Sequence, residues 1–183
     1  MTIFTEPTPN PRTMKFLPGE SISTVPLDFV TAPADDALLQ EIFDIYGVTG
    51  VHIGDVFIAV TVEEPSMWPD VRKAVTSALE VGFSGFNASK YREEMNANNA
   101  SEQDTEIVTR IKDVIETYVR PSVANDGGDI VFGSFDENTG LLRLSMRGAC
   151  SGCPSSTATL KMGIKNLMSH FAPEVRDIES LTM

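Results

Sequence analysis

Apolar residues in the first half of the chain recur three and four positions apart in two segments, which predicts two helices. The first segment covers residues 38–46 and follows Asp35, and the second covers 68–79 and follows Ser66. Asp and Ser are common at a helix N-terminus, and the spacing places the apolar residues on one helical face. The predicted buried stripes are Leu38, Leu39, Ile42, Phe43 and Tyr46, then Trp68, Val71, Val75, Ala78 and Leu79.

The period changes to two between these helices, which predicts β-structure. Residues 48–62 alternate apolar and other side chains, with Gly54 and Asp55 between the two runs. This pattern predicts a β-hairpin with a two-residue turn at Gly54–Asp55. The proline-rich start of the chain, centred on TMKFL at 13–17, predicts two further strands.

The second half of the chain also contains segments of helical and of strand periodicity. Helical periodicity covers residues 107–118 and is predicted to end near Pro121, because the residue before a proline disfavours helical geometry. DIVFGSF and LLRLSM, joined by DENTG, predict a second hairpin, and a further helix begins at Pro154. A short last strand is predicted around EVRDI, residues 174–178.

A polar stretch without aromatic residues separates the two halves and predicts a linker. We therefore expect two small α+β domains, residues 1–90 and 104–183, joined by a linker at 91–103. In the second domain a small sheet packs on two helices.

Composition is that of a globular protein, with 42% hydrophobic and 22% charged residues. The net charge of −12 argues against a nucleic-acid partner, because phosphate contacts need clustered Lys and Arg. We expect no membrane partner either, since no run approaches the roughly 18 apolar residues of a membrane span. The first residues do not form a secretory signal.

The chain has only two cysteines, Cys150 and Cys153, in the sequence RGACSGCPSS. The Cys-x-x-Cys spacing lets neighbouring sulfurs bind one metal centre or form a redox disulfide. Cys153 precedes Pro154 at the predicted helix N-terminus, whose free N–H groups favour a negative sulfur. The small residues Ser151 and Gly152 are expected to leave both sulfurs open to solvent.

Charge along the sequence supports the same expectation for the thiols. Residues 139–172 contain no Asp or Glu but contain Arg143, Arg147, Lys161 and Lys165. A positive neighbourhood would favour thiolate over thiol.

Three kinds of chemistry remain open for the pair besides a plain structural role. Structural zinc needs four ligands, and the two histidines are expected to be out of reach: His52 lies in the other half, and His170 at the far end of the following helix. Thioredoxin-type redox chemistry fits poorly, because the preceding elements form a hairpin and not a βαβ unit. An iron–sulfur cluster needs four thiolates, so two chains would share one cluster across a two-fold axis.

Two regions resemble the Nfu-type iron–sulfur cluster scaffold and carrier proteins, whose C-terminal domain is NifU-like. They are TEPTPNPRTMKFLPG, residues 5–19, and VRPSVANDGGDI followed by RGACSGCPSSTATLKMGI. The resemblance implies a non-enzymatic carrier in which Cys150 and Cys153 hold a [4Fe–4S] cluster between two subunits of a homodimer. It also implies an upstream cluster scaffold as donor and apo-iron–sulfur proteins as recipients.

The remaining motifs have structural interpretations. Gly127 and Gly128 predict a tight turn with positive φ, and PTPNP predicts turn and edge-strand architecture without a docking role. Two cysteines without a disulfide framework indicate a reducing compartment. Since the resemblance begins almost at Met1, we expect the bacterial cytoplasm, or the mitochondrial matrix after processing.

Overall fold

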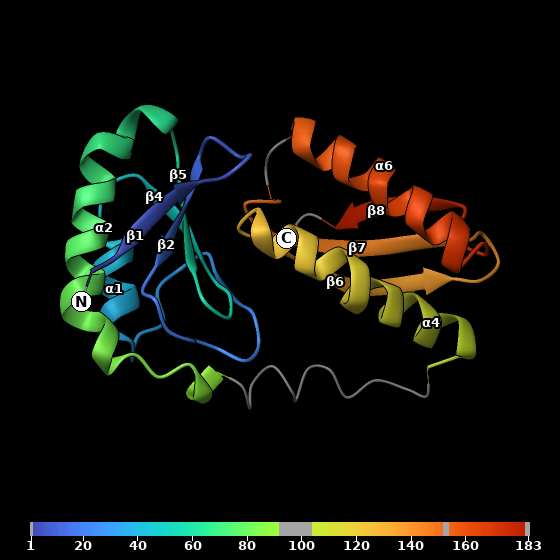
Figure 1. Ribbon diagram of the computed structural model, residues 1–183, viewed down its shortest axis with the longest axis horizontal. Coiled ribbons are helices and arrows are strands. Elements are labelled where there is room, and N and C mark those ends of the chain that lie inside the picture. The colour runs from blue at the N-terminus through green and yellow to red at the C-terminus, as the bar shows by residue number, and fades with distance from the viewer. Residues whose placement is uncertain (1, 92–103, 152–153, 182–183) are drawn as a thin grey trace.

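The computed structural model describes residues 2–91, 104–151 and 154–181, and it consists of two bodies that each contain a sheet and helices (Figure 1). One sheet has five strands and the other has three. Separate hydrophobic cores, one in each body, pack these sheets against helices. The predicted α+β fold class is confirmed. The predicted linker lies outside the described residues from position 92 onward, and the domain boundaries stay a prediction.

The first sheet is antiparallel throughout, in the order β1-β2-β5-β4-β3. Its strands are β1 Phe4–Pro7, β2 Thr13–Leu17, β3 Leu27–Phe29, β4 Val48–Ile53 and β5 Ile58–Val62. The predicted hairpin is confirmed, but the Gly54 N–H donates to the Phe57 carbonyl over 2.9 Å. The two central turn residues are therefore Asp55 and Val56, one position later than predicted. The short strand β3 was not predicted.

Helices cover one face of this sheet (Figure 1). They are α1 Ala37–Phe43, η1 Pro65–Met67, α2 Trp68–Gly82 and η2 Phe83–Gly85. Both predicted stripes are buried in large part, but Tyr46 is 84% exposed because α1 ends at Phe43. The helix cap is Asp36, whose carboxylate accepts a hydrogen bond from the Leu39 N–H, and not Asp35.

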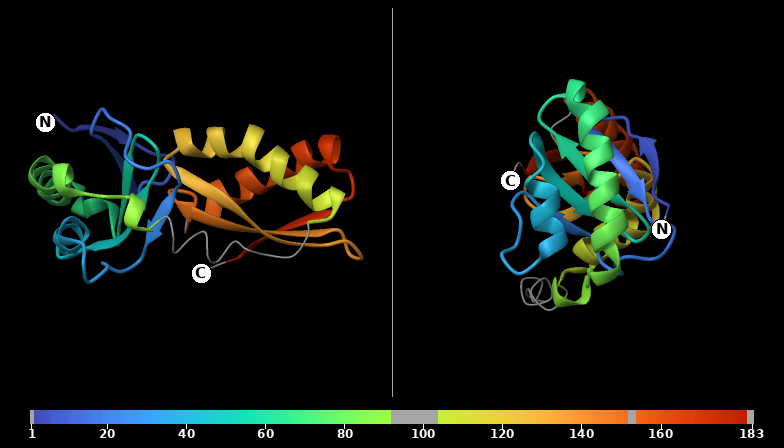
Figure 2. Two further views of the ribbon diagram at one scale, coloured as in Figure 1. Left: turned by 90° about the horizontal axis from the view of Figure 1, so that it is seen from below. Right: turned by 90° about the vertical axis from the view of Figure 1, so that its left-hand side faces the viewer.

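The second sheet has the order β6-β7-β8. The elements of this body are α4 Glu106–Val114, η3 Ile115–Val119, α5 Arg120–Asn125, β6 Gly128–Asp136, β7 Leu141–Gly148, α6 Pro154–Phe171 and β8 Asp177–Leu181. The hairpin β6–β7 and the last strand confirm the predictions, and β8 runs parallel to β7. The α4–α5 helical segment and α6 lie on the same side of the sheet (Figure 2).

The helix predicted to end near Pro121 continues to Asn125, so that prediction is wrong. Proline lacks an N–H, and its ring clashes with the carbonyl four residues earlier. The chain avoids this clash with one π-helical stretch, Ile115–Val119, just before the proline. Pro121 then occupies the first turn of α5, where its missing N–H is tolerated.

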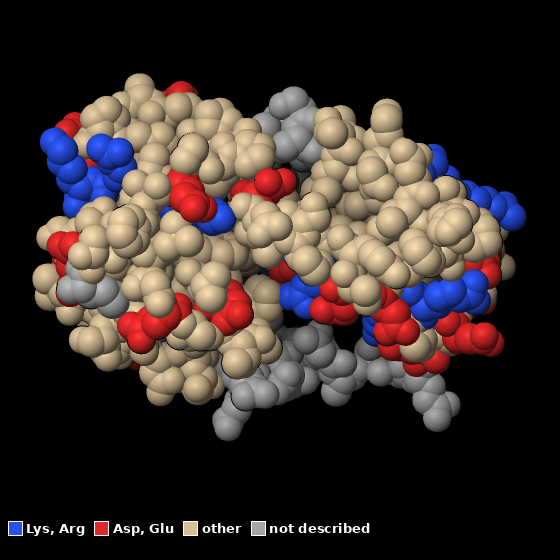
Figure 3. All heavy atoms as spheres, viewed as in Figure 1, with Lys and Arg blue, Asp and Glu red and all other residues tan. Residues whose placement is uncertain are grey.

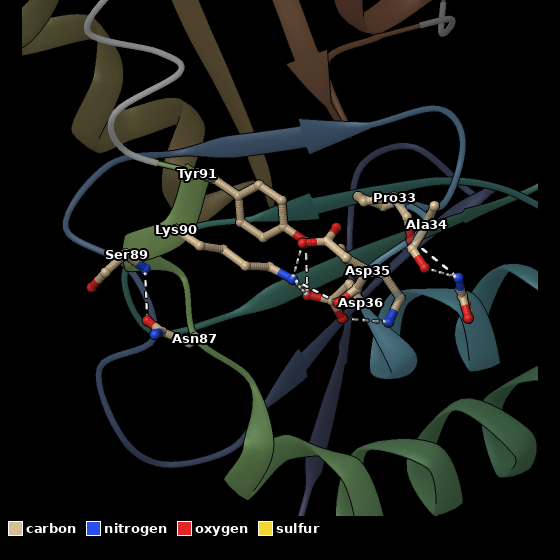
Figure 4. Close-up of polar contacts among 10 residues, drawn as sticks. Pro33, Ala34, Asp35, Asp36, Asn87, Ser89, Lys90 and Tyr91 are labelled. Atoms are coloured by element: carbon tan, nitrogen blue, oxygen red, sulfur yellow. Dashed lines mark hydrogen bonds and ion pairs between the residues drawn. The ribbon is translucent and has the colours of Figure 1, made fainter.

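A buried polar cluster fastens residues 90–91 to the start of α1 (Figure 4). The Tyr91 hydroxyl donates to Asp36 over 2.7 Å, and Lys90 Nζ lies 3.0 Å from the same carboxylate. Burial alone would raise the pKa of Asp36, but the hydrogen bonds from Leu39 N–H, Tyr91 and Lys90 together hold that pKa below its ordinary value of 3.8. Burial, followed by the bond to Asp36, raises the pKa of Tyr91 to about 12. The cluster therefore favours the ionised form of Asp36.

Replacing Asp36 by Asn is expected to lower the free energy of unfolding of this body by about 1–2 kcal/mol at neutral pH, because charged hydrogen bonds become neutral ones. Since the folded-state pKa is depressed, the carboxylate's contribution is present above the unfolded-state pKa and is lost as pH falls through the folded pKa. The difference between the wild type and Asp36→Asn should therefore shrink below pH 3.8. Urea unfolding followed by fluorescence of Trp68, the single tryptophan, measures this.

Asp35→Asn is the matched control, since that carboxylate is 76% exposed. Equal destabilisation by the two substitutions would contradict the assigned role of Asp36.

Candidate functional site

Cys150 lies in the turn that follows β7 and precedes α6, as predicted. The turn is held by its own backbone: the Cys150 N–H donates to the Arg147 carbonyl over 3.3 Å, and the Ser151 N–H to the Gly148 carbonyl over 3.0 Å. Gly148 has φ of +58°, a conformation that favours glycine. We refer to residues 148–151 as the cysteine loop. Cys153 lies outside the described residues, and its role stays a prediction.

The thiol of Cys150 is buried, which corrects the expectation of an open sulfur. Only 7% of the residue is exposed, and it belongs to the hydrophobic core of the second body. The sulfur lies against Gly128, where an added Cβ would come 2.5 Å from Sγ. Glycine at position 128 therefore makes the space that the sulfur occupies.

The predicted preference for thiolate is also wrong for Cys150 in this conformation. Burial, and then the negative charges of Asp126 and Asp129, raise the pKa of the Cys150 thiol to about 12. The segment 139–172 contains no acid, but strand pairing places Asp129 opposite Arg147, so acids from an earlier segment lie near the sulfur. A thiol in these surroundings is protonated at neutral pH.

The NDGGD segment forms the wall behind the cysteine loop. Gly127 has φ of +80°, as the sequence predicted, and its carbonyl accepts a hydrogen bond from the Ala149 N–H over 3.0 Å. Gly128 does not have positive φ, so its lack of a side chain serves close packing.

Asp129, the last residue of this segment, is 4% exposed and forms a two-pronged ion pair with Arg120. Arg120 Nε donates to one carboxylate oxygen over 2.8 Å and Nη2 to the other over 3.1 Å. In this geometry both oxygens of the buried carboxylate accept a charged hydrogen bond. The pair fixes the start of β6 to α5, and Arg120 also binds Glu116 one turn earlier.

An apolar groove of about 620 Å³ opens beside Cys150. It runs between α6 and the α4–α5 helical segment, and Figure 3 shows few charged side chains over this region. Its polar lining includes Ser122, Asp126 and Thr159, and Pro9 reaches it from the first body. Ala149 and Cys150 of the cysteine loop are among the residues that line the groove.

Residues of the first body also touch the cysteine loop, which the sequence did not predict. The Asn10 amide donates to the Ala149 and Ser151 carbonyls, over 3.2 Å each. Asp28 accepts a hydrogen bond from the Gly148 N–H over 3.3 Å. Asn10 belongs to the PTPNP motif, which therefore contacts the loop in addition to forming a turn. No feature of the sequence around Asp28 indicated that this residue contacts the loop.

The two histidines lie in different surroundings. A Cβ added to Gly148 would come 2.9 Å from Cγ of His52, so His52 packs against the cysteine loop although it belongs to the first body. His170 is in the last turn of α6 and packs edge-on against Phe171. Among the described residues, no three His, Cys, Asp or Glu side chains are grouped so that they could hold a metal ion.

These observations define an α+β protein with a thiol loop between a strand and a helix. Residues 3–85 match the family described as "Scaffold protein Nfu/NifU N terminal", and residues 111–179 match the "NifU-like domain". The chain belongs to the Nfu family of NifU-like scaffold proteins, and the resemblance inferred from the sequence is confirmed.

Curated relatives match along nearly the whole chain. "NifU-like protein 4, mitochondrial" of Arabidopsis thaliana is 38% identical over 98% of this chain and 65% of its own length. "NFU1 iron-sulfur cluster scaffold homolog, mitochondrial" of Homo sapiens is 37% identical over 99% of this chain and 72% of its own. The chain thus spans about two thirds of the length of such relatives. A crystal structure of protein SAV1430 from Staphylococcus aureus aligns with 43% of this chain and 99% of its own, at 26% identity and a TM-score of 0.39.

Gly128→Ala is expected to lower the free energy of unfolding by about 1–3 kcal/mol, because the new methyl group overpacks the wall behind the loop. It would meet the Arg147 carbonyl oxygen at 2.8 Å and the Cys150 nitrogen at 3.0 Å, which are backbone atoms that cannot move aside. Urea unfolding followed by circular dichroism measures the change.

Gly163→Ala in α6 is the matched control, because nothing lies within 4 Å of an added Cβ there. Alanine is the better helix former, so this variant should gain about 0.5–1 kcal/mol. A loss of similar size in both variants would refute the packing role of Gly128.

Proposed function

We propose that this protein is a non-catalytic carrier that binds a [4Fe–4S] cluster between two copies of the chain and passes it to apo-proteins. The observation that carries the proposal is the sole pair of thiols in a chain of this family, Cys150 and Cys153 in the sequence CSGC, of which Cys150 lies directly after β7. The human relative is named an iron–sulfur cluster scaffold homologue, which supports the assignment.

The thiol count supports sharing of the cluster. Iron–sulfur clusters are held by four cysteine thiolates, and one chain has two. A symmetric dimer meets the requirement with no other residue type. A cluster held between two loops is more accessible than one enclosed in a single core, which suits transfer.

The conformation described above is one that does not ligate iron. Iron is bound by thiolate, so the Cys150 proton has to leave when the metal binds. The buried sulfur has to turn away from Gly128 and reach the surface first. Binding of the cargo therefore includes a rearrangement of the cysteine loop.

We place the protein in the bacterial cytoplasm or the mitochondrial matrix, where a reducing environment keeps the thiols free. The word "mitochondrial" in the names of several relatives supports the second location. Partners are an upstream scaffold that supplies the cluster and apo-proteins that accept it. Within the part of the chain that the structure describes, none of the helices has the length and apolarity to cross a bilayer.

Anaerobic reconstitution with iron and sulfide should give a brown dimer with about two irons per chain, as one four-iron cluster shared by two chains requires. Absorbance, iron and sulfide analysis, and mass by light scattering measure this together. A colourless protein with stoichiometric zinc, or efficient insulin-disulfide reduction without metal, would refute the carrier assignment.

Cys150→Ala and Cys153→Ala should each abolish stable cluster binding, because each variant leaves the dimer with two of four thiolates. Ser151→Ala lies between the two cysteines and is the control that should keep the cluster. A brown, dimeric Cys150→Ala protein with unchanged iron content would contradict the ligand assignment.

A further inference from the structure

The face of the first sheet that is turned away from its helices is polar and yet buried. Strand register places its polar side chains on neighbouring strands, and we call this set the polar face: Thr13, Lys15, Asp28, His52 and Thr61. Thr13, Lys15 and His52 are 2%, 8% and 2% exposed. In an antiparallel sheet with one face on the core, the polar face is ordinarily solvated. Here something other than water covers it.

The cover is the cysteine loop of the same chain, together with the residues just before β6. Asp28 binds the Gly148 N–H, and Lys15 Nζ donates to the Asn125 carbonyl over 3.0 Å. A Cβ added to Gly127 would lie 2.9 Å from Cγ of Lys15. The contact therefore extends across both glycine-rich segments that surround Cys150.

Asn10 holds the loop most directly. It is 1% exposed, and its amide nitrogen donates to the carbonyls on either side of Cys150. Its side-chain oxygen accepts from the Arg12 N–H over 3.1 Å, which fixes the orientation of the amide. Since both flanking carbonyls are bound, the backbone at Cys150 cannot rotate without breaking these hydrogen bonds.

His52 shows that the contact is not optimised as a permanent core. The Asp28 carboxylate can only accept a hydrogen bond, so His52 Nδ1 is the donor, and 3.1 Å separates this nitrogen from the carboxylate oxygen. The other ring nitrogen, Nε2, is buried without a hydrogen-bond partner among the described residues. An unsatisfied buried polar atom costs free energy, which lowers the stability of the docked state.

We propose that the polar face, with Asn10, is a docking surface for the cysteine loop of the same chain, and that docking holds Cys150 in its inward conformation. Release of the loop is then required before the sulfur can be presented to a ligand. The proposal rests on the proposed function only for the identity of that ligand, an iron–sulfur cluster. Because the cluster binds the released state, docking and loading oppose one another.

The test uses the full chain with Cys153→Ser, so that Cys150 is the only thiol. In this background Asn10→Asp keeps the side-chain oxygen that the turn needs but replaces the donating amide by an oxygen facing two carbonyls. The rate of alkylation of Cys150 by N-ethylmaleimide should rise about tenfold or more, because the population of released loop increases. An added negative charge by itself would slow a thiolate reaction, so a rise reports exposure.

Asn87→Asp is the matched control: its oxygen accepts from the Ser89 N–H over 3.0 Å, away from the loop, and its rate should stay at the parental value. Asp28→Ala is a second test, since it removes the acceptor of the Gly148 N–H and should also raise the rate. A parental rate in Asn10→Asp or in Asp28→Ala, with a native circular dichroism spectrum, overturns the proposal.

Cluster loading, measured in parallel on the chain with both cysteines, separates this proposal from the function. Faster alkylation with faster loading in Asn10→Asp supports both. Faster alkylation without a cluster in any variant supports docking and refutes the carrier assignment. An unchanged alkylation rate with normal loading refutes docking alone.

Discussion

The close approach of two backbone segments, Gly127–Gly128 and the cysteine loop, is the constraint on which the rest of the site depends. The Gly127 carbonyl binds the Ala149 N–H, and an added Cβ at Gly148 would lie 2.7 Å from that carbonyl oxygen. Any side chain at Gly128 or Gly148 would separate the segments. The absence of a side chain at Gly128 leaves space for the sulfur of Cys150, and the first body binds the same loop through Asn10 and Asp28.

This geometry also decides the electrostatics of the thiol. The hairpin β6–β7 places Asp129 beside Arg147, and the turn before it places Asp126 near Cys150. Arg120 neutralises Asp129 in part, but the sulfur still lies among apolar side chains, and both Asp126 and Asp129 raise the pKa of the thiol. Burial and charge act in the same direction on the thiol, and both change only when the loop moves.

Much of the fold could be predicted because it depends on local periodicity. Both hairpins and the helix from Pro154 follow from alternation, helical spacing and turn residues near in sequence. The site could be predicted only as a pair of cysteines. A segment without acids predicted a positive neighbourhood, but residues from other segments also surround the thiol in the fold. Strand pairing places Asp129 near Cys150, and the turn before β6 places Asp126 there.

The contact between the two bodies had no recognisable signal for a related reason. Lys15, Asp28 and His52 alternate with apolar residues as they would on a solvated sheet face, so the pattern cannot distinguish water from a polar partner. Pro121 gave a signal for a helix end that the structure does not have. The π-helical stretch before it removes the clash of the proline ring, and the helix continues.

Docking and cargo binding share one loop, so their free energies are linked. If the docked state has an equilibrium constant K over the released state, the apparent affinity for a ligand that needs the released state falls by a factor of 1 + K. A very stable docked state would prevent loading, and a very weak one would leave the thiol exposed to oxidants. The interface fits a value between these limits, because its hydrogen bonds to the loop backbone are made, while His52 Nε2 has no hydrogen-bond partner in the part of the chain that the structure describes. The same residues that protect Cys150 therefore also limit how tightly the protein can hold what it carries.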